Sequence, residues 1–239
     1  MACEVCGRAG QEALRRTASG LPTLGLGLSS ASDAAALAQT AEEAGFAAVW
    51  VPSGALTDVA AKVAKATGRI AIVAIVDVSL SPDAEPALPA PAELAGRLAY
   101  AVRFTDPPLT ARLSARACRR AGAAAMRKVH SLAAKADTPV LIQGSCHESL
   151  EWIAERAEAW AYDRARLACV PTLLTEWRRV AGDKPFIQML AEGPGLDDRV
   201  DALVRDGVDH IVVMMSGGTG SPGLWRLPGK LEASENAAF

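Results

Sequence analysis

The sequence lacks a long apolar run, a strong charge of one sign and a cluster of histidines. No apolar stretch reaches the ~18 to 20 residues of a membrane span, and the first residues are too polar for a signal peptide. The net charge of −2 provides no basic surface for nucleic acid or for an anionic membrane. The 3 histidines are scattered and lack clustered carboxylates, which argues against a catalytic metal. We therefore expect a cytoplasmic protein that binds no metal, membrane or nucleic acid.

Two enzyme motifs are also missing, and the cysteines form no recognisable site. Without G-x-S-x-G a hydrolase elbow is unsupported, and without G-x-x-x-x-G-K-[ST] there is no P-loop. The 5 cysteines are an odd number, and in a reducing compartment they should be free thiols. Cys3 and Cys6 form C-x-x-C, but no strand precedes them and no nearby Cys or His pair completes a zinc site. We expect the N-terminal arm that carries them to be dispensable for stability.

What the sequence does contain is a strand, helix and strand pattern that recurs along its length. An apolar run at 21–28 is followed by an amphipathic segment with a Gly stop, and then by a second apolar run at 46–54. Parallel units of this kind build α/β folds, and 239 residues are close to the ~250 typical of a (β/α)8 barrel. We therefore predict a (β/α)8 TIM barrel at 20–225, between an N-terminal arm at 1–19 and a C-terminal tail at 226–239.

The individual elements follow from β-branched runs and from apolar residues spaced by three and four. The first helix should begin after Ser32, a good N-cap, and end at Gly45. Four prolines between 81 and 91 exclude a regular helix after the third strand, so the connection to the fourth strand is reduced. Strands are predicted at 23–28, 47–51, 70–78, 97–104, 139–143, 159–162, 186–190 and 210–215, and helices at 33–44, 56–66, 108–135, 148–158, 172–181 and 197–206.

The turn after the fifth strand is a candidate ligand site, because this fold builds function at the C-terminal ends of its strands. Ser145 and Glu148 have the spacing of a capping box, which would fix a helix N-terminus. Free amides at such an end can hold a phosphate, and Gly144 would let a ligand approach the backbone. The structural alternative is an ordinary capped helix with a glycine in a tight turn.

The Gly-rich segment 216–221 is a second candidate, since many barrels bind phosphate in the loops after their seventh and eighth strands. The alternative is a flexible exit loop that leads to a disordered tail. Among the histidines, His147 alone is expected at this face of the barrel. We expect His130, within a helix, and His210, at the bottom of the barrel, to be structural.

Several segments resemble the bacterial luciferase-like monooxygenase superfamily, over roughly residues 21–215. AALAQTAEEAGFAAVWVPSG, followed by ATGRIAIVAIV, is similar to the family's helix ending in AEE-x-GF, its VW strand and its T-x-RI strand. TPVLIQGSCHESLEWIAERAEAWAYD and LAGRLAYAVRFTD are similar to later units of the family. The resemblance implies a (β/α)8 barrel that uses reduced FMN or the deazaflavin F-420 for monooxygenation or hydride transfer.

The resemblance also implies roles for particular residues. The family's non-prolyl cis peptide, which backs the flavin ring, falls near Ala74, Ile75 and Val76. Asp106 takes the position of an acidic proton donor. His147, the histidine expected at the same face of the barrel, would assist it. The alternative for Asp106 is a cap of the helix that begins near Pro108. Together with the strand ends, the resemblance predicts cofactor contacts from Ser53, Ala74, Ile75, Val76, Thr105, Gln143, Gly144, Ser145, Gly217 and Gly218.

Departures from the family pattern leave three functions open. Arg103 and Phe104 stand where small residues usually leave room for the cofactor, and the family's long insertion is missing. The first function is an oxidoreductase that acts on a small organic substrate with reduced FMN or deazaflavin. The second is a shortened barrel that binds a flavin or a partner without turnover. The third is a phosphosugar or small-acid barrel enzyme without a redox cofactor. A homodimer is possible, because many barrels dimerise.

Overall fold

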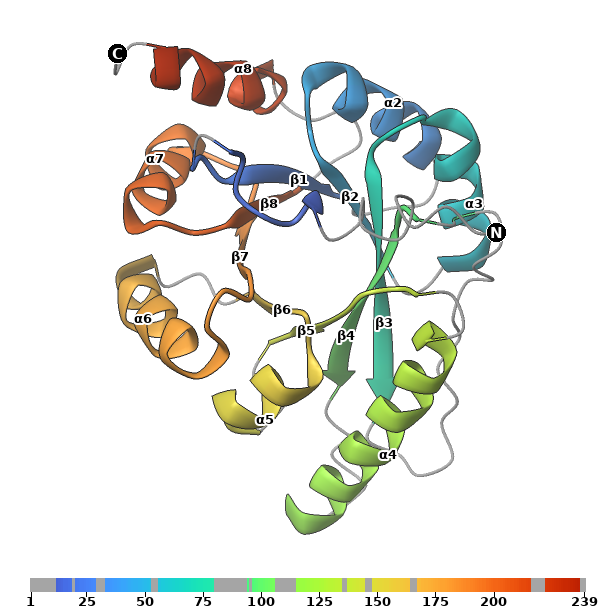
Figure 1. Cartoon of the computed structure of the whole chain (residues 1–239). Coiled ribbons are helices and arrows are strands. Elements are labelled where there is room, and N and C mark those ends of the chain that lie inside the picture. The colour runs from blue at the N-terminus through green and yellow to red at the C-terminus, as the bar shows by residue number, and fades with distance from the viewer. Residues whose placement is uncertain are drawn as a thin grey trace.

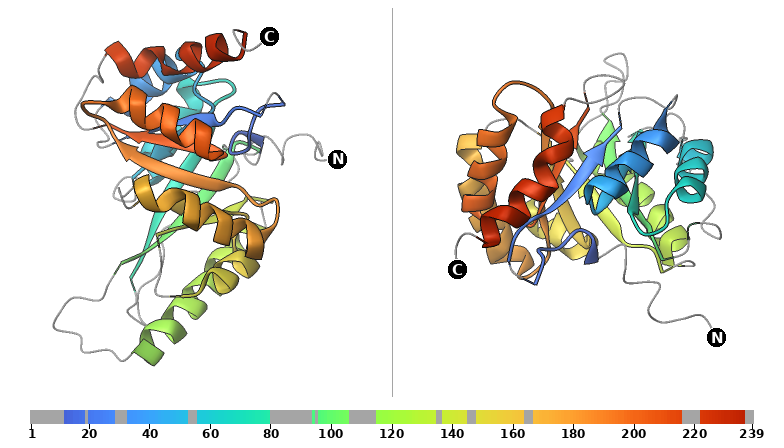
Figure 2. Two further views of the ribbon diagram at one scale, coloured as in Figure 1. Left: turned by 90° about the vertical axis from the view of Figure 1, so that its left-hand side faces the viewer. Right: turned by 90° about the horizontal axis from the view of Figure 1, so that it is seen from above.

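Eight parallel strands pair in sequence order and close into a barrel in the computed structural model, with helices around the outside (Figure 1, Figure 2). The predicted (β/α)8 fold is therefore confirmed. The structure describes residues 12–18, 20–28, 33–52, 56–79, 94, 96–105, 115–134, 137–144, 148–163, 167–215 and 222–236. The strands are β1 (Thr23–Gly27), β2 (Ala48–Val51), β3 (Ala71–Ser79), β4 (Leu98–Thr105), β5 (Val140–Gln143), β6 (Ala159–Tyr162), β7 (Phe186–Ala191) and β8 (His210–Met214). The helices are α2 (Ala34–Ala44), α3 (Leu56–Ala66), α4 (Ala115–Ala134), α5 (Leu150–Arg156), α6 (Val170–Ala181), α7 (Leu196–Asp206) and α8 (Pro222–Asn236), with a 3-10 turn η3 (Leu167–Cys169).

Most predicted elements are present, with ends that differ by one or two residues. α3 and β6 have the predicted bounds. Gly45 ends α2 as predicted, in the left-handed region with φ of 95°, which a glycine adopts without strain. The cap Ser32, the Pro-rich segment 81–91 and the start of the helix predicted at 108–135 lie outside the described residues.

Each strand divides its side chains between two apolar layers, because successive residues point to opposite faces. On β3, Val73 and Ile75 belong to the layer inside the barrel, whereas Ile72 and Ala74 belong to the layer beneath the helices. Many interior positions on the other strands are alanine, such as Ala101 on β4. Side chains fill this interior, so a ligand must bind at one end of the barrel.

The described part of the arm before β1 closes the floor of the barrel, which argues against the expectation that the arm is dispensable. Leu14 is 2% exposed and packs with the interior layer. The hydroxyl of Thr23 donates to the carbonyl of Ala13 at 2.8 Å, and Arg16 Nη2 donates to the carbonyl of Val208 at 3.2 Å. Sequence patterning missed this contact because a single apolar residue carries it. Cys3 and Cys6 lie outside the described residues.

The predicted C-terminal tail is largely the helix α8, which crosses the expected boundary at residue 225. Leu224, Leu227 and Leu231 are buried at helical spacing, and Lys230 Nζ lies 3.0 Å from a carboxylate oxygen of Asp201 on α7. The sequence pattern did not predict this helix because it contains Pro228, and proline usually ends a helix. No helix in the described part of the chain, α8 included, combines the length and apolarity needed to cross a bilayer.

The carboxylate of Glu42, near the end of α2, holds the chain that enters β3. Its oxygens accept from the amides of Gly68 at 3.0 Å, Arg69 at 2.5 Å and Ile70 at 2.7 Å. Burial alone would raise the pKa of Glu42, but the three amide hydrogen bonds outweigh it and the pKa is lowered. Glu42 therefore fixes the N-terminal end of β3 by charge-assisted hydrogen bonds.

A buried imidazole joins the strands where the barrel closes. His210 on β8 lies with Nδ1 2.7 Å from the hydroxyl of Thr23 on β1, and its Nε2 accepts from Trp50 Nε1 on β2 at 3.4 Å. The Thr23 hydroxyl already donates to Ala13, so His210 Nδ1 must carry the proton. Gly25 makes the room, since a Cβ there would lie 2.6 Å from His210 Nε2. Burial lowers the pKa of His210 to about 3, so the imidazole is neutral.

Replacing Glu42 by Ala should lower the free energy of unfolding by about 1 to 2 kcal/mol. This is the lower part of the range for charge-assisted hydrogen bonds, because the carboxylate is partly exposed. Glu43→Ala is the matched control, since Glu43 is exposed on the same helix, and should change stability by less than ~0.5 kcal/mol. The contribution of Glu42 should be complete above the unfolded pKa of about 4.3 and be lost as pH falls through the lowered folded pKa. The free energy of unfolding of both variants is measured with urea at neutral pH, and an equal loss in the two would contradict this role.

Acid should destabilise the native chain through His210. The unfolded histidine takes up a proton below pH ~6.5, while the folded one stays neutral until about pH 3. Between these values the free energy of unfolding should fall by about 1.4 kcal/mol per pH unit from this residue alone. Chemical denaturation from pH 7 to 4 would measure the slope. His210→Gln should remove this part of it and His130→Gln, on α4, should not, so equal slopes in all three proteins would refute the assignment.

Candidate functional site

A row of polar side chains crosses the C-terminal mouth of the barrel over β3, β4 and β5. The strand alternation that places Ile75, Ala101 and Leu141 inside the barrel turns the residues two positions later toward the mouth. These residues are Asp77, Arg103 and Gln143. The register pairs Asp77 with Arg103, and Arg103 with Gln143. The three side chains are therefore neighbours at the end where this fold binds its ligands.

Asp77 and Arg103 form an ion pair with two parallel hydrogen bonds. Arg103 Nε donates to Asp77 Oδ1 at 2.6 Å, and Nη2 donates to Oδ2 at 2.9 Å. The hydrogen bond to Asp77 raises the pKa of Arg103 despite partial burial, and the charge of Asp163 raises it further. The side chains are 39% and 29% exposed for Arg103 and Asp77, so the pair faces solvent or a ligand. Asp77 thus holds the guanidinium group of Arg103 in one orientation in the mouth.

Gln143 is the one buried polar residue of this row, at 4% exposure. Its Nε2 donates to Asp163 Oδ2, just beyond β6, at a long 3.4 Å. Its Oε1 is buried and accepts no hydrogen bond within the described part of the chain. An acceptor in this state favours a donor from water or from a ligand, because leaving it unpaired costs about 1 to 3 kcal/mol.

Gly144 follows Gln143 in the left-handed region, with φ of 79°. A Cβ at this position would meet only the carboxylate oxygens of Asp163, both at 3.9 Å. The Gly144 amide donates to the carbonyl of Ala161 at 2.8 Å, and its carbonyl accepts from Trp160 Nε1 at 2.8 Å. Gly144 thus leaves space in the mouth, but its amide, expected to meet the cofactor, is already used. A side chain there would strain the backbone, so substitutions of Gly144 would not isolate ligand binding.

The remaining described candidates divide between the two faces of their strands. Thr105 lies at the end of β4, where its hydroxyl donates to the carbonyl of Val78 at 3.4 Å. Ile75 belongs to the interior layer, whereas Ala74 and Val76 pack beneath the helices, away from the mouth. All peptide bonds in the described residues are trans, those of β3 included.

Six predicted site residues cannot be placed, because they lie outside the described residues. They are Ser53, Asp106, Ser145, His147, Gly217 and Gly218. The capping box predicted from Ser145 and Glu148 is nevertheless wrong, because α5 begins after Ser149. The Ser149 hydroxyl accepts from the amide of Trp152 at 3.3 Å, which makes Ser149 the N-cap. The N-cap is thus Ser149, four residues after Ser145 in the sequence.

Sequence reasoning missed Asp163 altogether, and treated Arg103 only as an obstacle to a cofactor. The signal that could have found them is the parity of each strand. Each charged residue of the mouth follows a small or apolar interior residue by an even number of positions, so it lies on the same face of its strand. This holds for Asp77, Arg103 and Asp163, and Asp163, for example, follows Ala161 by two positions. Among the described residues, no three His, Cys, Asp or Glu side chains come together as a metal site would require.

Comparisons with known proteins show the fold and no closer relationship. No protein-family model and no curated protein sequence matches the chain. DmoA from Hyphomicrobium sulfonivorans superposes with a TM-score of 0.63 at 8% identity, over 90% of this chain and 88% of that one. An F420-dependent secondary alcohol dehydrogenase, in complex with an F420-acetone adduct, gives 0.60 at 13% identity, over 89% and 98%.

Barrels of a different chemistry are similar to the same degree. A truncated 3-deoxy-D-arabino-heptulosonate 7-phosphate synthase from Thermotoga maritima gives a TM-score of 0.58 at 14% identity, over 92% of this chain and 88% of that one. Identities this low show a shared barrel alone, since one fold carries many activities. The function must therefore be argued from the mouth of the barrel.

The Asp77 and Arg103 pair should couple energetically by about 1 kcal/mol, at the upper end for partly exposed pairs, because it is bidentate. A double-mutant cycle with Asp77→Ala and Arg103→Ala, followed by urea unfolding, measures this coupling. The matched control is Glu176 and Arg179 on α6, a single-contact exposed pair at 2.9 Å. Its coupling should be smaller, because solvent screens an exposed pair with a single contact. Equal coupling in the two cycles would show that the mouth pair is not specially ordered.

Proposed function

We propose that this chain is a luciferase-like oxidoreductase that holds reduced FMN or the deazaflavin F-420 at the mouth of its barrel. It would use this cofactor for hydride transfer or monooxygenation of a small organic substrate. The sequence resemblance supports this proposal, and an F420-dependent secondary alcohol dehydrogenase is one of the enzymes that have the same barrel. The observation that carries it is the buried Oε1 of Gln143 in the mouth, which accepts no hydrogen bond from any residue that the structure describes.

A carboxamide at this position fits both cofactors. Flavin and deazaflavin rings share an edge on which an N–H lies between two carbonyl groups. The Gln143 Oε1 would accept from that N–H, which satisfies an acceptor that has no partner among the described residues. Asp163, which accepts from Nε2 of the same amide, would keep the oxygen turned toward the cofactor.

The other mouth residues would supply hydrogen-bond donors and orientation. The cofactor itself supplies the redox chemistry, so the protein needs to bind it, orient it and shield it from water. Arg103, held by Asp77, would place guanidinium N–H donors beside the ring in a fixed orientation. In this proposal Asp106 is the proton donor or orienting acid, as the family resemblance implies, and His147 assists it.

The second candidate is a barrel that binds a flavin or a partner without turnover. The observation that favours it is the same arginine. Arg103 occupies the mouth where the family that the sequence resembles usually has small residues, and its ion pair with Asp77 holds it there. A side chain of this size would leave less room for a substrate above the cofactor.

Cofactor binding should depend on Gln143 and not on a matched buried glutamine. Gln188 on β7 is also fully buried, and its Oε1 has no hydrogen-bond donor in the described part of the chain, but it faces the helices. Gln143→Leu should weaken FMN or F-420 binding by about tenfold or more, the loss of one buried hydrogen bond to the ligand. Gln188→Leu should change it by less than about twofold. Absorbance and fluorescence titrations of the purified protein with each cofactor, oxidised and reduced, measure both.

Three outcomes decide between the functions. Binding that depends on Gln143, together with turnover on a panel of small alcohols, aldehydes and sulfides, supports the oxidoreductase. The same binding without turnover supports the non-catalytic barrel. Failure of both cofactors to bind, while the protein unfolds cooperatively, would reject the flavin site and leave a barrel enzyme without a redox cofactor.

A further inference from the structure

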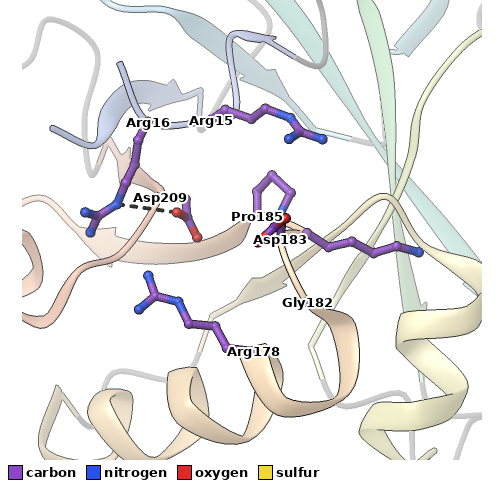
Figure 3. Close-up of a pocket in the computed structure, with 8 residues that line it drawn as sticks. Arg15, Arg16, Arg178, Gly182, Asp183, Pro185 and Asp209 are labelled. Carbon is purple, nitrogen blue, oxygen red and sulfur yellow. Dashed lines mark ion pairs between the residues drawn. The ribbon is translucent and has the colours of Figure 1, made fainter. Parts of the chain in front are cut away.

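A cleft of about 540 Å³ lies at the N-terminal ends of β7 and β8, on the face opposite to the mouth (Figure 3). Three segments far apart in sequence form it: the arm before β1, the end of α6 with the loop into β7, and the residue before β8. Four of its side chains are cationic and two are carboxylates, which leaves a net charge of +2. These side chains are Arg15, Arg16, Arg178 and Lys184, and Asp183 and Asp209.

One side of the cleft is a fixed framework. Arg16 lies with Nε 3.4 Å from Asp209 Oδ1, while Nη1 donates to the carbonyl of Gly20 at 3.0 Å. Asp209 Oδ2 accepts from the amide of Phe186 at 2.9 Å, and Lys184 Nζ donates to the carbonyls of Ala154 and Ala157. These contacts compensate the charges of Arg16 and Asp209 and hold Lys184 against α5.

Two arginines keep donors that the framework does not use. Arg178 on α6 is exposed and donates from Nη2 to the carbonyl of Gly207 at 2.7 Å, and its Nε and Nη1 make no hydrogen bond within the described residues. The exposed side chain of Arg15 makes none with the described part of the chain. Both line the cleft, so their N–H groups are available to a ligand.

The guanidinium groups of Arg16 and Arg178, which both line the cleft, lie close to each other beside Gly207. A Cβ built on Gly207 would lie 2.9 Å from Arg16 Nη2 and 3.5 Å from Arg178 Nη2. Figure 3 shows Arg16, from the arm, and Arg178, from α6, with Asp209 beside Arg16. Two like charges this close, with one carboxylate beside Arg16, favour an anion.

We propose that this cleft is a second ligand site, for a small molecule that carries a phosphate group. A phosphate has up to two negative charges and three acceptor oxygens, which match the net charge and the unused N–H groups of Arg15 and Arg178. The volume is in the range of small-molecule sites, which is about 300 to 1,000 Å³. A bound phosphate would join the arm to the loop before β7 and hold the arm against the barrel floor.

Calorimetric titration of the full-length protein with inorganic phosphate and pyrophosphate, at constant ionic strength, tests the proposal. Saturable binding is expected, and Arg178→Gln should weaken it by about tenfold. Arg179→Gln is the matched control, because Arg179 is the next residue on α6 but pairs with Glu176 and Glu151 outside the cleft. It should change the affinity by less than about twofold.

A second readout uses the arm. Trypsin cleaves after arginine, so bound pyrophosphate should slow cleavage after Arg15 and Arg16 in the wild type and in Arg179→Gln, but not in Arg178→Gln. Citrate separates phosphate from carboxylate recognition. Three results would each overturn the proposal. They are citrate binding as tight as that of pyrophosphate, an equal loss of affinity in Arg178→Gln and Arg179→Gln, and no saturable binding in the wild type. None of these results depends on a flavin in the mouth.

Discussion

Closure of the barrel depends on the space around one imidazole. His210 fits between Thr23 and Trp50 only because Gly25 has no side chain, and a Cβ there would overlap the ring. This contact links β8, β1 and β2, the strands at which the two ends of the sheet meet. A closed sheet has one register for all its strands, and a slip by one residue would reverse every side chain. The polar row of the mouth, on the far side of the barrel, therefore depends on the fit at this seam.

The residues that carry the family resemblance act on the barrel itself. The glutamate of the AEE segment, Glu42, binds the backbone of the TGRI segment at Gly68, Arg69 and Ile70. Both segments lie at the N-terminal ends of the strands, away from the mouth. This part of the motif therefore stabilises the entry of the chain into β3 and carries no information on what the mouth binds. Active sites in this fold lie at the opposite, C-terminal ends of the strands. The low identities to barrels of several chemistries agree with this separation.

The fold could be predicted from sequence because β-branched runs and capped amphipathic helices each need only a few neighbouring residues. The run that forms β3 and the glycine stop at Gly45 are examples. The elements that were misjudged depend on contacts distant in sequence. Leu14 is a floor residue only because the barrel exists above it, and α8 continues through Pro228 because three leucines bury its face. In the mouth, Asp77 and Arg103 become partners only when the register of β3 and β4 is known.

The seam also sets an order of events during synthesis of the chain. Thr23 and His210 are separated by 187 residues, so β1 is made long before its partner β8. At about 5 to 20 residues per second, one edge of β1 waits roughly 10 to 40 s without its final neighbour. An open strand edge invites pairing with other chains, and glycine is a poor strand former. Gly25 and Gly27, required in the finished barrel by the side chains that lie over them, thus also weaken the nascent strand as a template for aggregation.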